Sequence, residues 1–217
     1  MNNDATTYLT VSDTAEAEIT EKKSRFIATV LHIESEEEAT AVLADFRKRY
    51  WDARHNCYAY VLGKKSELER FSDDGEPSGT AGRPILEVIK GRGLTNTMII
   101  VTRYFGGVLL GTGGLVRAYT DSSALAVDTA KEEGRLVNMR LLLKADIKAD
   151  YTLSGKVQYS LAGMDVKVFD TIYEDSVIFK VGIPADEADK VLDKITDVTN
   201  AKVLIERGET EYFALTT

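Results

Sequence analysis

The sequence predicts an α+β protein with two domains, on three observations. Its 217 residues exceed the length of one average domain. Its hydrophobic share of 44% and charged share of 29% match globular proteins, which excludes a disordered chain. In both halves, segments in which apolar residues recur at every second position alternate with segments in which they recur about every 3.6 positions. Strands and helices are therefore expected in each half.

The first half opens with a predicted β-hairpin. Residues 16–33 indicate two strands that break near residues 21–24, and residues 26–31 form the second strand. Ser35 and Glu38 have the spacing of a capping box, and apolar residues then recur every three to four positions. This pattern predicts an amphipathic helix over residues 36–50.

Two more strands and two more helices are expected in the first half. Residues 55–62 alternate as a strand, and the apolar residues inside 96–102 predict a strand buried on both faces. A turn-rich loop at 72–79 precedes a short helix over 81–90. Thr112 is expected to cap a longer helix that ends by Gly134. The predicted inner face of that helix consists of Leu115, Ala118, Tyr119, Ser122 and Leu125.

The second half predicts a ferredoxin-like βαββαβ domain. Strict alternation over 141–149 indicates a half-buried strand, and a helix over 152–162 follows and ends at Gly163. Pro184 is expected to start a second helix. The other predicted strands are 166–173, 177–183 and 201–206. We therefore expect one domain over residues 1–134 and a second over residues 135–217.

Composition excludes several classes of protein. The apolar runs are too short for a membrane-spanning helix, and residues 1–13 lack a secretory signal, so a cytoplasmic protein is expected. A single cysteine, Cys57, excludes an intrachain disulfide framework and a thiolate zinc cluster. The net charge of −8 argues against a general nucleic-acid coat. However, residues 83–117 hold five basic residues and one acid, and residues 63–114 hold eleven of the 16 glycines.

The glycine-rich segment 103–119 is the strongest candidate for a site. It leads from a buried strand into a helix N-terminus, where free backbone N–H groups favour an anion such as phosphate. Arg103 and Arg117 are candidates to clamp the anion, and Tyr104 and Phe105 are candidates to stack on bases. Alternatively, the glycines serve turns, the arginines form surface ion pairs, and the aromatic residues are core. The candidate nucleic-acid or anion-binding residues are Arg83, Arg92, Arg103, Tyr104, Phe105, Gly106, Gly107, Gly111, Thr112, Gly113, Gly114 and Arg117.

Two known phosphate-binding motifs do not fit this segment. No Gly-Lys-Ser or Gly-Lys-Thr occurs in the chain, which excludes a Walker loop. The third glycine of a dinucleotide-binding motif is replaced by Val116, and no acidic ribose ligand follows. We therefore expect no nucleotide cofactor.

A second candidate is a polar cleft formed by His55, Asp73, Asp74 and Glu76. His55 and Cys57 share one face of a strand at about 7 Å, which is too far for a nucleophile–base pair. The acids of the loop can pair with His55 for acid–base chemistry or bind a hard metal, or they can hold the loop in shape by Asx turns and salt bridges. We assign no catalytic residue and no metal ligand.

Three segments of the chain carry distinctive motifs. The first is His55-x-Cys57-Tyr58-Ala59-Tyr60. The second runs from Phe71 to Pro84, as Phe-Ser-Asp-Asp-Gly-Glu-Pro-x-Gly-Thr-Ala-Gly-x-Pro. The third is Arg103-Tyr104-Phe105-Gly106-Gly107-x-x-Leu110-Gly111. Together these motifs closely resemble the IMPACT family, in its bacterial YigZ/YvyE-like branch.

The resemblance implies a fold for each domain. The amino-terminal domain is expected to be an α/β sandwich like a ribosomal-protein domain and domain IV of elongation factor G. The carboxy-terminal domain is expected to resemble domain V of that factor. Eukaryotic relatives regulate translation through an additional domain, whose mechanism is not expected to carry over. For the bacterial branch, the fold implies binding of nucleic acid or the ribosome. A peptidase activity is discounted because the chain has no His-rich dinuclear metal site.

Our leading hypothesis is a cytoplasmic, non-enzymatic protein that binds RNA or the ribosome and regulates translation. The alternatives are an enzyme that acts on a small phosphorylated or peptide substrate in the cleft, and a module that binds a protein partner. No cofactor and no membrane contact are expected, and the sequence leaves the oligomeric state open.

Overall fold

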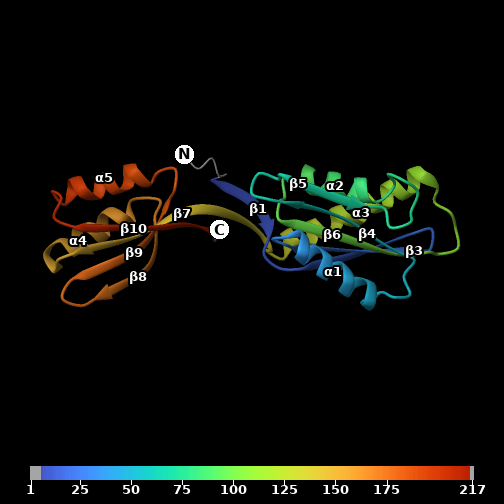
Figure 1. Cartoon of the computed structure of the whole chain (residues 1–217), viewed down its shortest axis with the longest axis horizontal. Coiled ribbons are helices and arrows are strands. Elements are labelled where there is room, and N and C mark those ends of the chain that lie inside the picture. The colour runs from blue at the N-terminus through green and yellow to red at the C-terminus, as the bar shows by residue number, and fades with distance from the viewer. Residues whose placement is uncertain (1–5, 216–217) are drawn as a thin grey trace. The chain divides into compact units, whose positions relative to one another are not determined.

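The computed structural model describes residues 6–215 and divides them into two compact units. The first is Tyr8–Asn138, and the second is Met139–Leu215 together with residues 6–7. The structure is mixed α/β, with two five-stranded sheets and five helices in the described residues, as the sequence predicts (Figure 1). Within residues 6–215, no helix has the length and the apolar content needed to cross a membrane.

The sheet of the first unit has the strand order β2-β3-β6-β4-β5, and each neighbouring pair is antiparallel. The predicted hairpin is confirmed, with Lys22 and Lys23 at positive φ in its turn. Strand β5 was missed because it is a polar edge strand without alternation. The strands are β2 (Ala15–Glu21), β3 (Ser24–His32), β4 (His55–Leu62), β5 (Leu68–Ser72) and β6 (Thr97–Tyr104).

Helices cover both faces of this sheet (Figure 1). Helix α1 (Glu36–Arg49) packs on one face, and α2 (Gly82–Gly91) and α3 (Gly111–Glu132) pack on the other. The sheet therefore has a hydrophobic core on each side, which explains why β6 is buried along nearly its whole length and apolar at residues 98–101. The predicted cap is confirmed in its first half, because the Ser35 side chain accepts from the N–H of Glu38, whereas the Glu38 carboxylate accepts from the N–H of Glu34 rather than from that of Ser35.

Two predictions for α3 are wrong. Thr112 does not cap the helix, because the N-cap is Leu110 and the chain enters the helix through Gly111 at a φ of 73°. Leu125 is 41% exposed although it was expected on the inner face. At about 100° per residue, Leu125 lies roughly 80° around the helix from Leu115, whereas the buried Ala126 lies within about 20°.

The second unit has the predicted βαββαβ arrangement. Strand β7 pairs with β9 and β10, and β9 pairs with β8. Both helices contribute to one hydrophobic core on one face of the sheet. The elements are β7 (Leu136–Ala149), α4 (Tyr151–Ala162), β8 (Lys167–Tyr173), β9 (Val177–Pro184), α5 (Ala188–Val198) and β10 (Leu204–Leu215). A strand that the sequence did not indicate, β1 (Thr7–Val11), adds to β7.

Some element ends in the second unit differ from the prediction. Pro184 ends β9 instead of starting a helix, because a turn in which the N–H of Glu187 bonds to its carbonyl precedes α5. Strand β10 begins at Leu204 rather than at 201, because Asn200 and Ala201 have φ of 52° and 54°. Helix α4 begins at Tyr151, because the Asp150 side chain caps the N–H of Leu153.

Candidate functional site

A cavity of about 430 Å³ opens where β4 begins and β6 ends. Antiparallel pairing of these strands places His55 directly opposite Arg103. The loop after β5 supplies Gly75, Glu76 and Pro77 to one wall. The other lining residues are Arg54, Phe105, Leu109, Leu110, Gly111, Thr112 and Leu115. The acidic loop and the glycine-rich loop, which are far apart in the sequence, therefore line one cavity.

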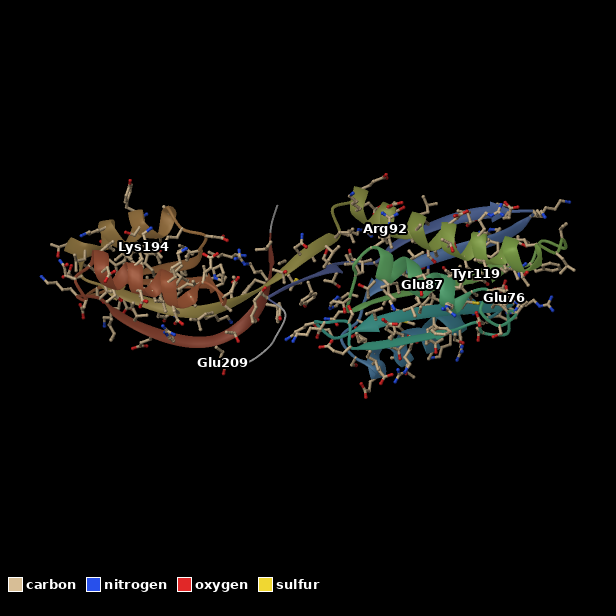
Figure 2. The ribbon with its side chains drawn as sticks, turned by 90° about the horizontal axis from the view of Figure 1, so that it is seen from above. Glu76, Glu87, Arg92, Tyr119, Lys194 and Glu209 are labelled. Atoms are coloured by element: carbon tan, nitrogen blue, oxygen red, sulfur yellow. The ribbon has the colours of Figure 1, made fainter. Side chains whose placement is uncertain are left out.

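Glu76 is the centre of the polar groups in this cavity. Figure 2 labels Glu76 and Tyr119 near each other in the first unit. Its side chain is only 4% exposed, and its Oε1 accepts hydrogen bonds from Arg103 Nη1 at 2.5 Å and from Tyr119 Oη at 2.9 Å. The Arg103 guanidinium also lies 5.3 Å from the ring centroid of Phe26 and 5.6 Å from that of Phe105. The carboxylate thus neutralises a guanidinium that would otherwise be a buried, unpaired charge.

His55 is held in one orientation by the backbone. Its Nδ1 lies 2.8 Å from the carbonyl oxygen of Asp74, so this nitrogen carries a hydrogen and donates it. In the neutral ring, Nε2 is then an acceptor, and it lies 3.9 Å from Glu76 Oε1. The cavity wall therefore presents an imidazole nitrogen beside a carboxylate.

Cys57 and Tyr119 lie behind Glu76 and keep their protons. The Cys57 Sγ is 3.0 Å from the carbonyl oxygen of Asp73 and 3.3 Å from Tyr119 Oη. Burial raises the pKa of the Cys57 thiol and the pKa of the Tyr119 hydroxyl, and nearby Glu76 raises both further. Cys57 is therefore a structural thiol rather than a nucleophile, and Tyr119 is a donor to Glu76 at neutral pH.

Asp73 and Asp74 shape the acidic loop and do not line the cavity. The Asp73 carboxylate accepts three backbone hydrogen bonds at 2.8–3.0 Å, from the N–H groups of residues 79, 81 and 82. Asp74 accepts from the N–H of Asn56 at 2.7 Å and from Arg47 Nη2 at 3.3 Å. Of the four residues in the predicted polar cleft, only His55 and Glu76 face the cavity, and the two aspartates hold the loop that carries Glu76.

The glycines of segment 106–114 have two roles. Gly106 is required for close packing, because a Cβ there would lie 2.0 Å from the backbone of Lys23. Gly107 and Gly111 have φ of 84° and 73°, which other residues rarely adopt. Gly111 and Thr112 line the cavity, whereas Gly113 and Gly114 follow in the same turn without lining it. No side chain caps α3, so its first N–H groups remain available to an anion.

The basic residues of the predicted surface fall into two groups. Arg103 is buried against Glu76, and Arg92 pairs with Asp128 at 2.8 Å, so both charges are compensated. Arg83 and Arg117 are exposed and form no ion pair with any residue of the described part of the chain. Arg103 and Arg117 do not form a shared clamp, because Arg103 is enclosed in the cavity wall and Arg117 is on the outward face of α3.

The aromatic residues at the end of β6 are partly exposed. Tyr104 donates a hydrogen bond from its Oη to Asp52 at 2.9 Å, and Phe105 is 39% exposed at the cavity. Two cavity residues were not among the predicted site residues: Arg54, whose guanidinium lies 5.8 Å from the Phe105 ring centroid, and Leu109, which is 82% exposed. Two signals could have found them: Arg54 directly precedes His55, and Leu109 is an apolar residue inside a glycine-rich loop.

Residues 22–127, which include the whole cavity, match the Impact N-terminal domain. Residues 147–202 match a domain of unknown function (DUF1949). The chain is 39% identical over 205 residues to the IMPACT family member YvyE of Bacillus subtilis (strain 168), and the match covers 94% of this chain and 93% of that protein. The chain belongs to the IMPACT family.

Other IMPACT-family proteins are similar over different shares of the chain. The IMPACT family member YigZ of Escherichia coli (strain K12) is 34% identical over 84% of this chain and 88% of its own length. Protein IMPACT of Mus musculus is 36% identical over 43% of this chain and 30% of its own length. A solved structure described as "Crystal structure of an hypothetical protein" matches with a TM-score of 0.61 and 31% identity, over 94% of this chain and 98% of that chain. The predicted IMPACT membership and fold are thus confirmed.

Proposed function

We propose that this IMPACT-family protein binds single-stranded RNA in the cytoplasm, free or in the ribosome, and thereby regulates translation. The observation that carries the proposal is the cavity wall formed by Arg54, Phe105 and the first turn of α3. A partly exposed ring stacks on any base, and a guanidinium and a positive helix end attract the neighbouring phosphates. These are the groups that sequence-tolerant RNA binding uses.

The charge distribution supports a local RNA contact rather than a general one. The chain carries a net charge of −8, so its overall charge repels RNA. Arg54, Arg83 and Arg117 are exposed and have no acidic partner in the described residues, which leaves their charges available to phosphates. Arg92 and Arg103 contribute little to RNA binding, because Asp128 neutralises the charge of Arg92 and Glu76 neutralises that of Arg103.

The translational part of the proposal rests on family membership. The resemblance described above associates eukaryotic members with translational control, and the mouse protein is similar over 43% of this chain. The ribosome is rich in single-stranded RNA loops whose unstacked bases are available to aromatic side chains.

The test is binding of the full-length protein to a fluorescein-labelled single-stranded RNA decamer and to purified ribosomes. Three phosphate contacts predict that affinity falls on the order of 20-fold between about 50 and 200 mM salt. Changing Arg54, Arg83 and Arg117 together to Ala should weaken binding and remove most of this salt dependence. The matched control removes three unpaired exposed lysines of the second unit, Lys190, Lys194 and Lys202.

Binding that the arginine variant loses and the lysine variant keeps supports the proposed surface. If neither RNA nor ribosomes bind at low salt, the proposal is wrong. If both variants lose binding equally, the interaction depends on net charge alone and the assigned surface is wrong.

A second candidate function has its own support in the polar end of the cavity. His55 Nε2 and Glu76 lie together beside apolar walls, an arrangement that suits acid–base chemistry on a small phosphorylated or peptide substrate. This candidate predicts turnover of a small substrate that His55→Ala abolishes. A screen of phosphate esters and dipeptides for His55-dependent hydrolysis is the experiment that tests it.

A further inference from the structure

The polar end of the cavity presents hydrogen-bond acceptors that no protein group satisfies. Glu76 accepts the hydrogen bonds from Arg103 and Tyr119 on the same oxygen, Oε1. Its other oxygen, Oε2, accepts no hydrogen bond in the described structure, although the side chain is 96% buried (4% exposed). In the described residues, the fully buried side-chain atoms without a hydrogen-bond partner are Arg103 Nε and Ser123 Oγ, so Glu76 Oε2 is not sealed in the core. It is open to the cavity and can accept a hydrogen bond from a ligand that supplies an N–H group.

His55 adds a second acceptor beside it. Since Nδ1 donates to the Asp74 carbonyl, the open nitrogen of the neutral ring is Nε2, and it has no hydrogen bond to the protein. Nε2 is 3.9 Å from Glu76 Oε1, so both acceptors belong to one end of the cavity. An anionic group is disfavoured there by the carboxylate, which leaves a ligand edge with one or more N–H donors as the best match.

The rest of the cavity is suited to a flat, apolar body. Its walls include Pro77, Phe105, Leu109, Leu110 and Leu115, and its volume of about 430 Å³ is in the usual range for small-molecule pockets. The exit towards Arg54 and the first turn of α3 is electropositive. A ligand with an N–H edge, apolar faces and a phosphate on the opposite side fits these three regions in turn.

We propose that the cavity holds one unstacked RNA base that carries an amino group, with that edge directed at Glu76 Oε2 and His55 Nε2. This inference rests on the proposed RNA binding and identifies what the cavity selects. Adenine, cytosine and guanine each present an amino group on the Watson–Crick edge. Uracil presents one N–H between two carbonyl oxygens, and these oxygens would face the carboxylate. The cavity therefore discriminates against uracil.

The experiment changes the RNA while the protein stays intact. Three labelled decamers are compared by fluorescence anisotropy: ten uridines, the same strand with one central adenosine, and the same strand with a central purine riboside that lacks the amino group. A hydrogen bond to a charged acceptor predicts that the adenosine strand binds about tenfold more tightly than the uridine strand. The purine riboside strand should lose this gain.

Two protein variants locate the effect. Thr112→Trp fills the cavity from an exposed position in the first turn of α3, so it should fold normally and abolish the adenosine preference. Glu76→Gln replaces the oxygen acceptor by an amide donor and should abolish the same preference. If Glu76→Gln does not fold because Arg103 loses its counter-charge, the purine riboside comparison and the Thr112→Trp variant still test whether the base binds in the cavity.

The outcomes separate this inference from the proposed function. If all three decamers bind with equal affinity, RNA binding stands and the base-selective cavity is wrong. If the adenosine preference persists in Thr112→Trp, the base binds elsewhere and the inference is again overturned. If no decamer binds at low salt, the proposed function fails and the inference fails with it.

Discussion

Removal of the Glu76 carboxylate should destabilise the first unit strongly. Glu76 and Arg103 have side chains that are 4% and 6% exposed, so water cannot replace the lost partner of the guanidinium. A buried ion pair that loses one member typically costs about 3–5 kcal/mol of the free energy of unfolding, because the remaining charge is uncompensated. We expect Glu76→Ala to be in this range, and the loss of the acceptor for Tyr119 adds to the cost.

Urea denaturation followed by far-ultraviolet circular dichroism measures this cost. With a slope of about 2 kcal/mol per molar urea, the midpoint for the first unit should fall by about 2 M, while the transition of the second unit should not move. The matched control is Asp146→Ala, which breaks the pair of Asp146 with Lys180, whose side chains are 40% and 43% exposed. An exposed pair contributes about 0–1 kcal/mol, so this control should change little.

A double-variant cycle tests the physical reason. Arg103→Met alone leaves a buried carboxylate and should also be costly, whereas Glu76→Leu combined with Arg103→Met removes both charges and should cost less than either single change. A cost for Glu76→Ala as small as that for Asp146→Ala would refute the reasoning, because it would mean that water reaches the pair and the cavity wall is not closed.

Three further predictions follow from the same unit. Asp73→Ala removes the acceptor of three backbone N–H groups and should lower stability by about 2 kcal/mol in urea denaturation, and an unchanged midpoint would contradict the role of Asp73 in the loop. Because burial raises the pKa of its thiol, Cys57 should resist a thiol reagent at pH 8 until urea is added, and rapid labelling of the folded protein would show that the thiol is accessible. Burial and the hydrogen bond to Glu36 raise the pKa of Tyr60 to about 12 from 10.0, so its stabilising contribution is full below pH 10 and is lost as the pH rises through about 12. The loss of stability at alkaline pH should therefore be smaller in Tyr60→Phe than in the unchanged protein. Identical profiles of unfolding free energy against pH for the two proteins would contradict the raised pKa of Tyr60.

Features that depend on neighbours in the sequence were predictable. The start of α1 follows from Ser35 and Glu38, whose hydrogen bonds involve backbone groups within one turn. The alternation of residues 141–149 correctly places Ala145, Ile147 and Ala149 of β7 in the core, although Leu142, expected on the solvent face, is also buried. The order of strand-like and helix-like segments predicts the βαββαβ arrangement. The three IMPACT motifs also predicted the family, because they are contiguous segments.

Features that depend on register and burial were decided only by the folded structure. The pairing of β4 with β6 places His55 opposite Arg103, and packing of α3 on the sheet brings Tyr119 to Glu76. The sequence places Asp73, Asp74 and Glu76 in one acidic loop, yet only Glu76 enters the cavity, because the two aspartates satisfy backbone N–H groups of the loop and of β4. Arg103 looks like a free cation in the sequence and is a buried one in the fold. The periodicity of apolar residues specifies helices and strands, whereas the partner of a charged side chain depends on which distant segments come into contact. The cavity of this protein is formed where such distant segments come into contact.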